Sequence, residues 1–218
     1  MAQTILNPDQ ELILKVLAHE KLFVKNFYLT GGTALSEYYL QHRISEDLDF
    51  FSEREIDKIW LNTIAKKIKE EIKFEDKDIE ESFNRNLVYF KTLKGIIKTE
   101  FTYYPFQQIE TPKIIEGIKV DSFTDIAANK FFTVYQKPTA RHFIDLYLIL
   151  NLKHYSWDQL EKFARIKFDT VIDPIQLGSQ LIKSETVKDL PQMVIELEEK
   201  KWRRYFIEKA KALRNKLD

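Results

Sequence analysis

The chain contains 218 residues, 44% of them hydrophobic and 31% charged, so it is long and apolar enough to fold around a core of its own. Its 34 basic residues balance its 34 acidic ones, which argues against a protein that coats nucleic acid through net positive charge. Cysteine is absent, which excludes disulfides and thiolate metal sites, and no apolar run approaches the roughly 18 residues of a membrane span, so we expect a cytoplasmic globular protein.

A helix is predicted over residues 9–25, and an apolar strand over 27–30 follows it. Gly31, Gly32 and Thr33 come directly after this strand. A glycine pair by itself is usually a simple turn. It is also the kind of tight loop in which main-chain N–H groups can approach a phosphate.

The next two predicted elements are a short helix over residues 33–42 and a strand over 47–51. Asp47 and Asp49 share one face of this strand because side chains alternate along a strand, and their Cα atoms should lie about 6–7 Å apart. Such a pair alone is usually a solvated face. Beside a glycine loop it suits oxygen ligation of Mg²⁺ ions that also hold nucleotide phosphates. The combination therefore predicts nucleotidyl transfer.

The chain then continues through a helix into two more strands. Residues 52–55 resemble a helix cap, and isoleucines spaced four apart predict a helix behind it that packs on the sheet. Strands are predicted over 86–92 and 96–104, joined by a turn at 94–95. Glu100 is the only acidic residue in the second of these strands.

From residue 122 onward the pattern predicts helices only. They cover residues 122–136, 139–152, 156–167, 174–183 and 191–217. We therefore expect an α+β fold, with an α/β core over residues 1–118 and a helical half over 119–218 that completes the active-site cleft.

Four motifs follow one another along the chain: residues 31–35, 43–50, 125–130 and 141–147. In this order they resemble the AbiEii-type nucleotidyltransferases, the toxins of bacterial type IV toxin–antitoxin and phage-defence systems within the DNA-polymerase-β-like superfamily. The resemblance implies a polymerase-β-like core, a small mixed sheet with helices. One position departs from the pattern: His142 stands where the family often has an aspartate, so no role is assigned to it.

The resemblance implies that Asp47 and Asp49 bind metal in a site with two Mg²⁺ ions. Polymerase-β-like enzymes carry a third carboxylate on a neighbouring strand, and Glu100 would supply it here. The residue pattern alone is equally consistent with Glu100 being a charge on a half-exposed strand.

A nucleoside triphosphate would be held by the glycine loop together with two basic residues. These positions are Gly31, Gly32, Thr33, Arg43 and Lys130. Lys130 would place a compact positive charge on the triphosphate, and Asp145 would steer Lys130 or the nucleotide. Without the resemblance, Lys130 reads as a lysine whose stem lies on apolar surface. Asp145 lies in an apolar stretch and needs a cationic partner there, for which Arg141 and Lys130 are the candidates.

The resemblance implies transfer of a nucleotide to RNA, such as tRNA, or to a protein, in the presence of a cognate antitoxin that need not bind the toxin. Two alternatives stay open: a small-molecule acceptor such as an antibiotic, and a non-catalytic nucleotide-binding module. The basic segment 200–218 is interpreted either as a solvated helix face or as a contact for an RNA backbone.

Overall fold

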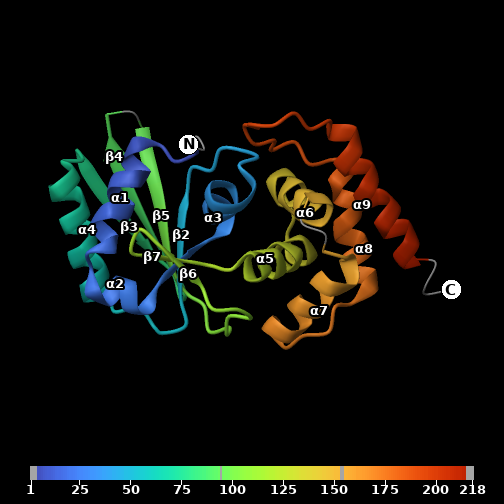
Figure 1. Ribbon diagram of the computed structural model, residues 1–218, viewed down its shortest axis with the longest axis horizontal. Coiled ribbons are helices and arrows are strands. Elements are labelled where there is room, and N and C mark those ends of the chain that lie inside the picture. The colour runs from blue at the N-terminus through green and yellow to red at the C-terminus, as the bar shows by residue number, and fades with distance from the viewer. Residues whose placement is uncertain (1–3, 94, 153–154, 215–218) are drawn as a thin grey trace. The chain divides into compact units, whose positions relative to one another are not determined.

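The computed structural model describes residues 4–93, 95–152 and 155–214. It divides the chain into two compact units, Met1–Ser122 and Phe123–Asp218 (Figure 1). The division falls after residue 122, whereas the sequence analysis puts the boundary after residue 118. Of the residues in between, 119 and 120 belong to a short strand of the first unit (Ile118–Val120) that is not predicted from the sequence, and 121 and 122 follow it.

One mixed sheet organises the first unit, and its described strands follow the order β3-β4-β5-β2-β1-β7-β6. The strands are β1 (Tyr28–Thr30), β2 (Leu48–Ser52), β3 (Asp76–Glu81), β4 (Arg85–Thr92), β5 (Gly95–Tyr103), β6 (Lys113–Ile115) and β7 (Ile118–Val120). The pairs β2–β5 and β1–β7 are parallel, and the other pairs are antiparallel. The central strands are those that the sequence predicts, each within about two residues.

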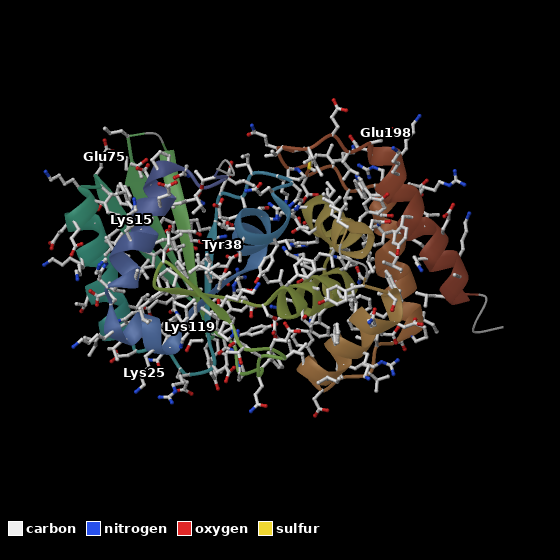
Figure 2. The ribbon with its side chains drawn as sticks, viewed as in Figure 1. Lys15, Lys25, Tyr38, Glu75, Lys119 and Glu198 are labelled. Atoms are coloured by element: carbon white, nitrogen blue, oxygen red, sulfur yellow. The ribbon has the colours of Figure 1, made fainter. Side chains whose placement is uncertain are left out.

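Three of the described strands, β3, β6 and β7, are not predicted from the sequence. Strand β3 reads Asp-Lys-Asp-Ile-Glu-Glu, so it lacks an apolar alternation and takes its conformation from pairing with β4. A charged strand at a sheet edge also discourages pairing with other chains. At the other edge, β6 and β7 have three residues each, too few for a periodic signal. Lys119 of β7 donates to the carbonyl of Lys25 at 2.6 Å, which anchors this edge (Figure 2).

The helices of the first unit are α1 (Pro8–Ala18), α2 (Lys21–Asn26), α3 (Gly31–Leu35), the π-helical turn η1 (Ser36–Leu40) and α4 (Lys58–Ile72). The opening helix is thus divided in two near residue 19, where the sequence predicts a continuous helix. The predicted cap at residues 52–55 is also wrong. Asp57 caps α4 instead, accepting from the N–H of Ile59 at 2.8 Å, while Ser52 ends β2.

The core of the first unit lies between the sheet and one layer of helices. Figure 1 shows α1, α2 and α4 on one side of the sheet and α3 on the other. Phe50 of β2 and Phe101 of β5 are buried and make ring contacts with Phe23 of α2 and Trp60 of α4. Because side chains alternate along β2 and β5, the residues next to these phenylalanines project from the opposite face.

The second unit is helical in its described part. It contains α5 (Phe123–Gln136), α6 (Ala140–Leu152), α7 (Trp157–Phe168), α8 (Pro174–Ile182), the 3₁₀ turn η2 (Lys183–Glu185) and α9 (Glu199–Arg214). The first four helices lie where the sequence predicts them. The last begins at Glu199 rather than at residue 191, and the segment over residues 191–198 is irregular. None of the helices in the described ranges combines the length and apolarity needed to cross a membrane.

Candidate active site

The sheet register aligns polar residues of three neighbouring strands. Thr30 on β1 lies opposite Asp49 on β2, and Asp49 lies opposite Glu100 on β5. Residues in register on neighbouring strands project from the same face. Leu48 and Phe50 are fully buried on the other face, while Asp47 and Asp49 are half-buried. Asp49 within β2 and Asp47 directly before it therefore lie on the side of the sheet that alternation predicts for them.

The predicted glycine loop is the first turn of α3, which begins at Gly31 rather than at residue 33, and it touches the second aspartate. Gly31 has a φ of +74°, and a Cβ placed on it would lie 3.0 Å from Cγ of Asp49 and closer still to a carboxylate oxygen. At Gly32 a Cβ would run into the guanidinium of Arg43 and lie 2.9 Å from the Ser45 hydroxyl. Each glycine thus leaves room for a polar side chain of the second motif, which the sequence spacing could not show.

Two buried polar side chains hold the loop that leads into β2. The Thr33 hydroxyl donates to the carbonyl of Asp47, so this hydroxyl joins the glycine loop to the acidic strand. The Gln10 amide donates to the carbonyls of Ser45 at 3.0 Å and Glu46 at 2.9 Å, although Gln10 belongs to the first turn of α1. Gln10 is not predicted from the sequence as a site residue, because its position resembles that of any polar residue beginning a helix.

The carboxylate of Glu100 accepts hydrogen bonds from two neighbouring side chains. Its carboxylate accepts from Nε of Arg85 on β4 at 2.8 Å and from the Thr102 hydroxyl at 2.6 Å. Burial raises the pKa of Glu100, but these hydrogen bonds and the nearby positive charges outweigh it, so the net pKa lies below its ordinary value. Glu100 is therefore ionised and paired.

Asp47 forms an ion pair with Lys98, at 2.8 Å, and Lys98 lies on the same face of β5 as Glu100. Burial lowers the pKa of the Lys98 ammonium, but its hydrogen bond to Asp47 and the surrounding carboxylates raise the net pKa above its ordinary value. Lys98 and Arg85 are functional candidates that the sequence analysis does not single out. Their contacts depend on strand pairing across long sequence separations.

The three candidate metal ligands supply oxygen donors only, which suits Mg²⁺. Within the described ranges, however, no three acidic, histidine or cysteine side chains converge as a metal-binding group. Lys98 contacts the carboxylate of Asp47, and Arg85 contacts that of Glu100.

A buried carboxylate next to the glycine loop extends the polar row. Asp121, directly after β7, is fully buried and accepts from the hydroxyl of Thr30 and from the amide of Gln108, both at 2.7 Å. Its carbonyl accepts from the hydroxyl of Tyr39 at 2.8 Å. Asp121 thus fixes the last residue of β1 immediately before Gly31. No periodic pattern in the sequence identifies Asp121, because β7 is so short.

In the second unit, Lys130 of α5 pairs with Asp145 of α6 at 2.7 Å, and both side chains are buried. Lys130 is one of the two partners that the sequence analysis names for Asp145. A second buried pair joins Asp125 of α5 to Lys167 of α7 at 2.6 Å. That Lys130 and Asp145 share a cleft with Asp49 stays a prediction.

The basic C-terminal segment is partly engaged within its own unit. Three ion pairs join Lys201 to Glu198 (3.0 Å), Arg203 to Glu199 (2.8 Å) and Arg204 to Glu208 (2.7 Å). Trp202, Phe206 and Ala210 form the buried side of α9. The side chains from residue 214 onward lie outside the described ones. This pairing favours the solvated-face interpretation, and an RNA contact stays a prediction.

Comparisons with known proteins agree with this architecture. An uncharacterised protein of Aquifex aeolicus (strain VF5), aq_aa25, is 30% identical over 165 residues, which cover 67% of this chain and 68% of that protein. A crystal structure from H. pylori, of a protein proposed to be a nucleotidyltransferase, superposes with a TM-score of 0.61 at 22% identity and covers 96% of this chain and 93% of its own. JHP933 from Helicobacter pylori superposes with a TM-score of 0.58 at 22% identity and covers 96% and 90%.

The two structures share the fold with this chain, and the predicted α+β fold with a polymerase-β-like nucleotidyltransferase core is confirmed. The family model described as nucleotidyl transferase AbiEii toxin, type IV TA system, matches residues 15–215. That match covers almost the entire sequence, including all four motifs. The chain therefore belongs to the AbiEii family of nucleotidyltransferase toxins of type IV toxin–antitoxin systems.

Proposed function

We propose that this protein transfers a nucleotide from a nucleoside triphosphate to an RNA acceptor such as tRNA, and that Asp47 and Asp49 are essential to the reaction. The observation that supports the proposal most is the contact between the glycine loop and the acidic strand, in which the carboxylate of Asp49 fills the space a side chain at Gly31 would occupy. A phosphate bound at that loop would lie beside the carboxylate. Nucleotidyl transfer needs such a juxtaposition of phosphate and metal-binding groups.

Asp47, Asp49 and Glu100 would hold Mg²⁺, which when bound would neutralise phosphate charge and favour ionisation of the attacking hydroxyl. Arg43, buried and lying against Gly32, would contribute a guanidinium to the phosphates beside the N–H groups of the loop. Thr33 would act mainly by positioning Asp47, because its hydroxyl donates to the Asp47 carbonyl.

Lys130 would contribute a positive charge to the triphosphate, and Asp145 would be a positioning residue. The ion pair at 2.7 Å gives the buried Lys130 ammonium an anionic partner, without which its burial would be costly. An aspartate that orients this lysine and balances its charge would explain why a carboxylate occurs within an apolar helix.

A small-molecule acceptor is the second candidate. It is favoured by the ion pairs on α9, which neutralise part of the positive charge that an RNA backbone would need. In the cell we propose that the protein acts as the toxin of a cytoplasmic, phage-defence toxin–antitoxin pair, with an antitoxin that need not bind it directly.

The test incubates the full chain with each α-labelled nucleoside triphosphate, Mg²⁺ and total tRNA. Asp49→Asn serves as the inactive variant. Asp78→Asn is the matched control. Asp78 lies on β3 in register with Tyr89 of β4, which is in register with Lys98 of β5, so Asp78 is on the same face of the sheet but two strands away from β5. Label should enter RNA with wild type and Asp78→Asn only, and less so as salt rises. Label found only in a small molecule would support the second candidate, and equal transfer by Asp49→Asn would refute the assignment of the site.

A further inference from the structure

Two cations compete for the carboxylates of the candidate metal site. Lys98 contacts Asp47 at 2.8 Å, and Arg85 donates through Nε to Glu100 at 2.8 Å and through its terminal nitrogen to the other carboxylate oxygen. The pairing of β4, β5 and β2 places all of these residues on one sheet face. That face therefore carries positive charge where a divalent cation would have to approach.

The exposure of the four side chains indicates which partner can move. Glu100 is only 9% exposed, whereas Arg85 is 57% exposed, so the guanidinium lies on the solvent side of the carboxylate. Lys98 and Asp47 are 28% and 29% exposed, so their ion pair is open to solvent. Long, partly solvated side chains can leave such pairs at modest cost. The carboxylates themselves belong to paired strands or to the anchored loop before β2.

We propose that Lys98 and Arg85 are exchangeable counter-ions of this site. In the free protein they neutralise Asp47 and Glu100 and oppose metal binding; when metal and nucleotide arrive together, they leave the carboxylates and contact the phosphates. This inference rests on the proposed function, because it requires that the carboxylates bind metal and that a triphosphate binds beside them.

The chemistry of the partners explains why the exchange works in one direction. A divalent cation alone would be repelled by the ammonium and the guanidinium. If it displaced them, both would lose their carboxylate partners. A metal-bound triphosphate brings its own oxygens, which are good partners for an ammonium and for the planar guanidinium. The resting protein would thus bind metal weakly by itself and strongly together with nucleotide.

The test titrates Mg²⁺ and, separately, Mn²⁺ into the full chain by calorimetry in the absence of nucleotide. Lys98→Met and Arg85→Met keep most of the side-chain volume and remove the charge. Lys91→Met is the matched control, since Lys91 lies on β4, is 65% exposed and contacts Glu75 at 3.7 Å. Lys98→Met and Arg85→Met should each tighten metal binding by about ten-fold. Lys91→Met should stay within about two-fold of wild type.

The second measurement repeats the titration with a non-hydrolysable nucleoside triphosphate analogue at saturating Mg²⁺. Here the sign reverses, and Lys98→Met and Arg85→Met should bind the analogue about ten-fold more weakly, with Lys98→Arg close to wild type. Circular dichroism verifies that each variant is folded, and Lys98→Gln replaces Lys98→Met if that variant is not.

Unchanged or weaker metal binding in both variants would overturn the inference, as would the absence of metal binding in every protein tested. Weaker metal binding is what a purely structural role for the two cations would produce. The proposed function is judged separately by label transfer with wild type and Asp49→Asn. If transfer depends on Asp49 while the metal titrations do not change, the function stands and only the exchange fails.

Discussion

Replacing Gly31 with alanine should damage the site through two separable effects. The residue has a φ of +74°, a conformation that costs an alanine roughly 1–2 kcal/mol. The new Cβ would also lie 3.0 Å from Cγ of Asp49 and closer to one of its oxygens, so the carboxylate must move. A misplacement of about 1 Å at a reacting group can reduce turnover by about 100-fold. We therefore expect a loss of that order in nucleotidyl transfer.

Two other glycines separate these effects. Gly95 has a φ of +140° but no atom within 4 Å of an added Cβ, so Gly95→Ala imposes backbone strain alone. Gly178, within α8, has open space and no positive φ, so Gly178→Ala should stabilise the protein by about 0.5–1 kcal/mol. Urea denaturation gives the stability of all three variants, and label transfer under saturating nucleotide gives their activity. Wild-type activity in Gly31→Ala, or a loss in Gly95→Ala as large as that in Gly31→Ala, would contradict this expectation.

Three further outcomes follow from the contacts described above. Gln10→Ala removes two hydrogen bonds to the loop before β2, along with its part in the α1 cap, and should lower the free energy of unfolding by about 1–3 kcal/mol in urea denaturation. Lys167→Met removes the cationic partner of the buried Asp125 carboxylate and should cost about 3–5 kcal/mol, whereas replacing both residues with apolar ones should restore much of the loss; equal stability of single and double variants would argue against this. The lowered pKa of Glu100 adds stability that is fully present above the unfolded-state pKa, near 4.3, and is lost as the pH falls through the folded-state pKa. Glu100→Gln should therefore unfold with a weaker dependence on acid pH, as followed by fluorescence from pH 6 down to pH 2.

The sequence predicts those parts of the fold that depend on local patterns. Alternation along one strand places Asp47 and Asp49 on one face, and the break at Pro138 divides α5 from α6. Local patterns do not reveal pairing between distant strands. The parallel alignment of β2 with β5 brings Glu100 beside Asp49 across about fifty residues of chain, and only this alignment shows that Lys98 faces Asp47.

The errors also have physical causes. The cap at Asp57 is displaced from the predicted one because Ser52 is still part of the paired strand β2. Strand β3 is not predicted, because its conformation comes from hydrogen bonds to β4 rather than from its own charged residues. The role of Gln10 depends on the loop that it contacts, and nothing in its own segment identifies it.

The alternation along β2 also acts on folding. A shift of one residue in the pairing of this strand would turn both aspartates into the layer that holds Phe50 and Phe101, and would expose Leu48 and Phe50 to water. Burying two carboxylates without partners would be very costly. The acidic residues proposed for catalysis therefore also select the register of the strand that carries them. Asparagine, which is still penalised in the core, is for this reason a safer inactivating substitution at these positions than alanine or valine.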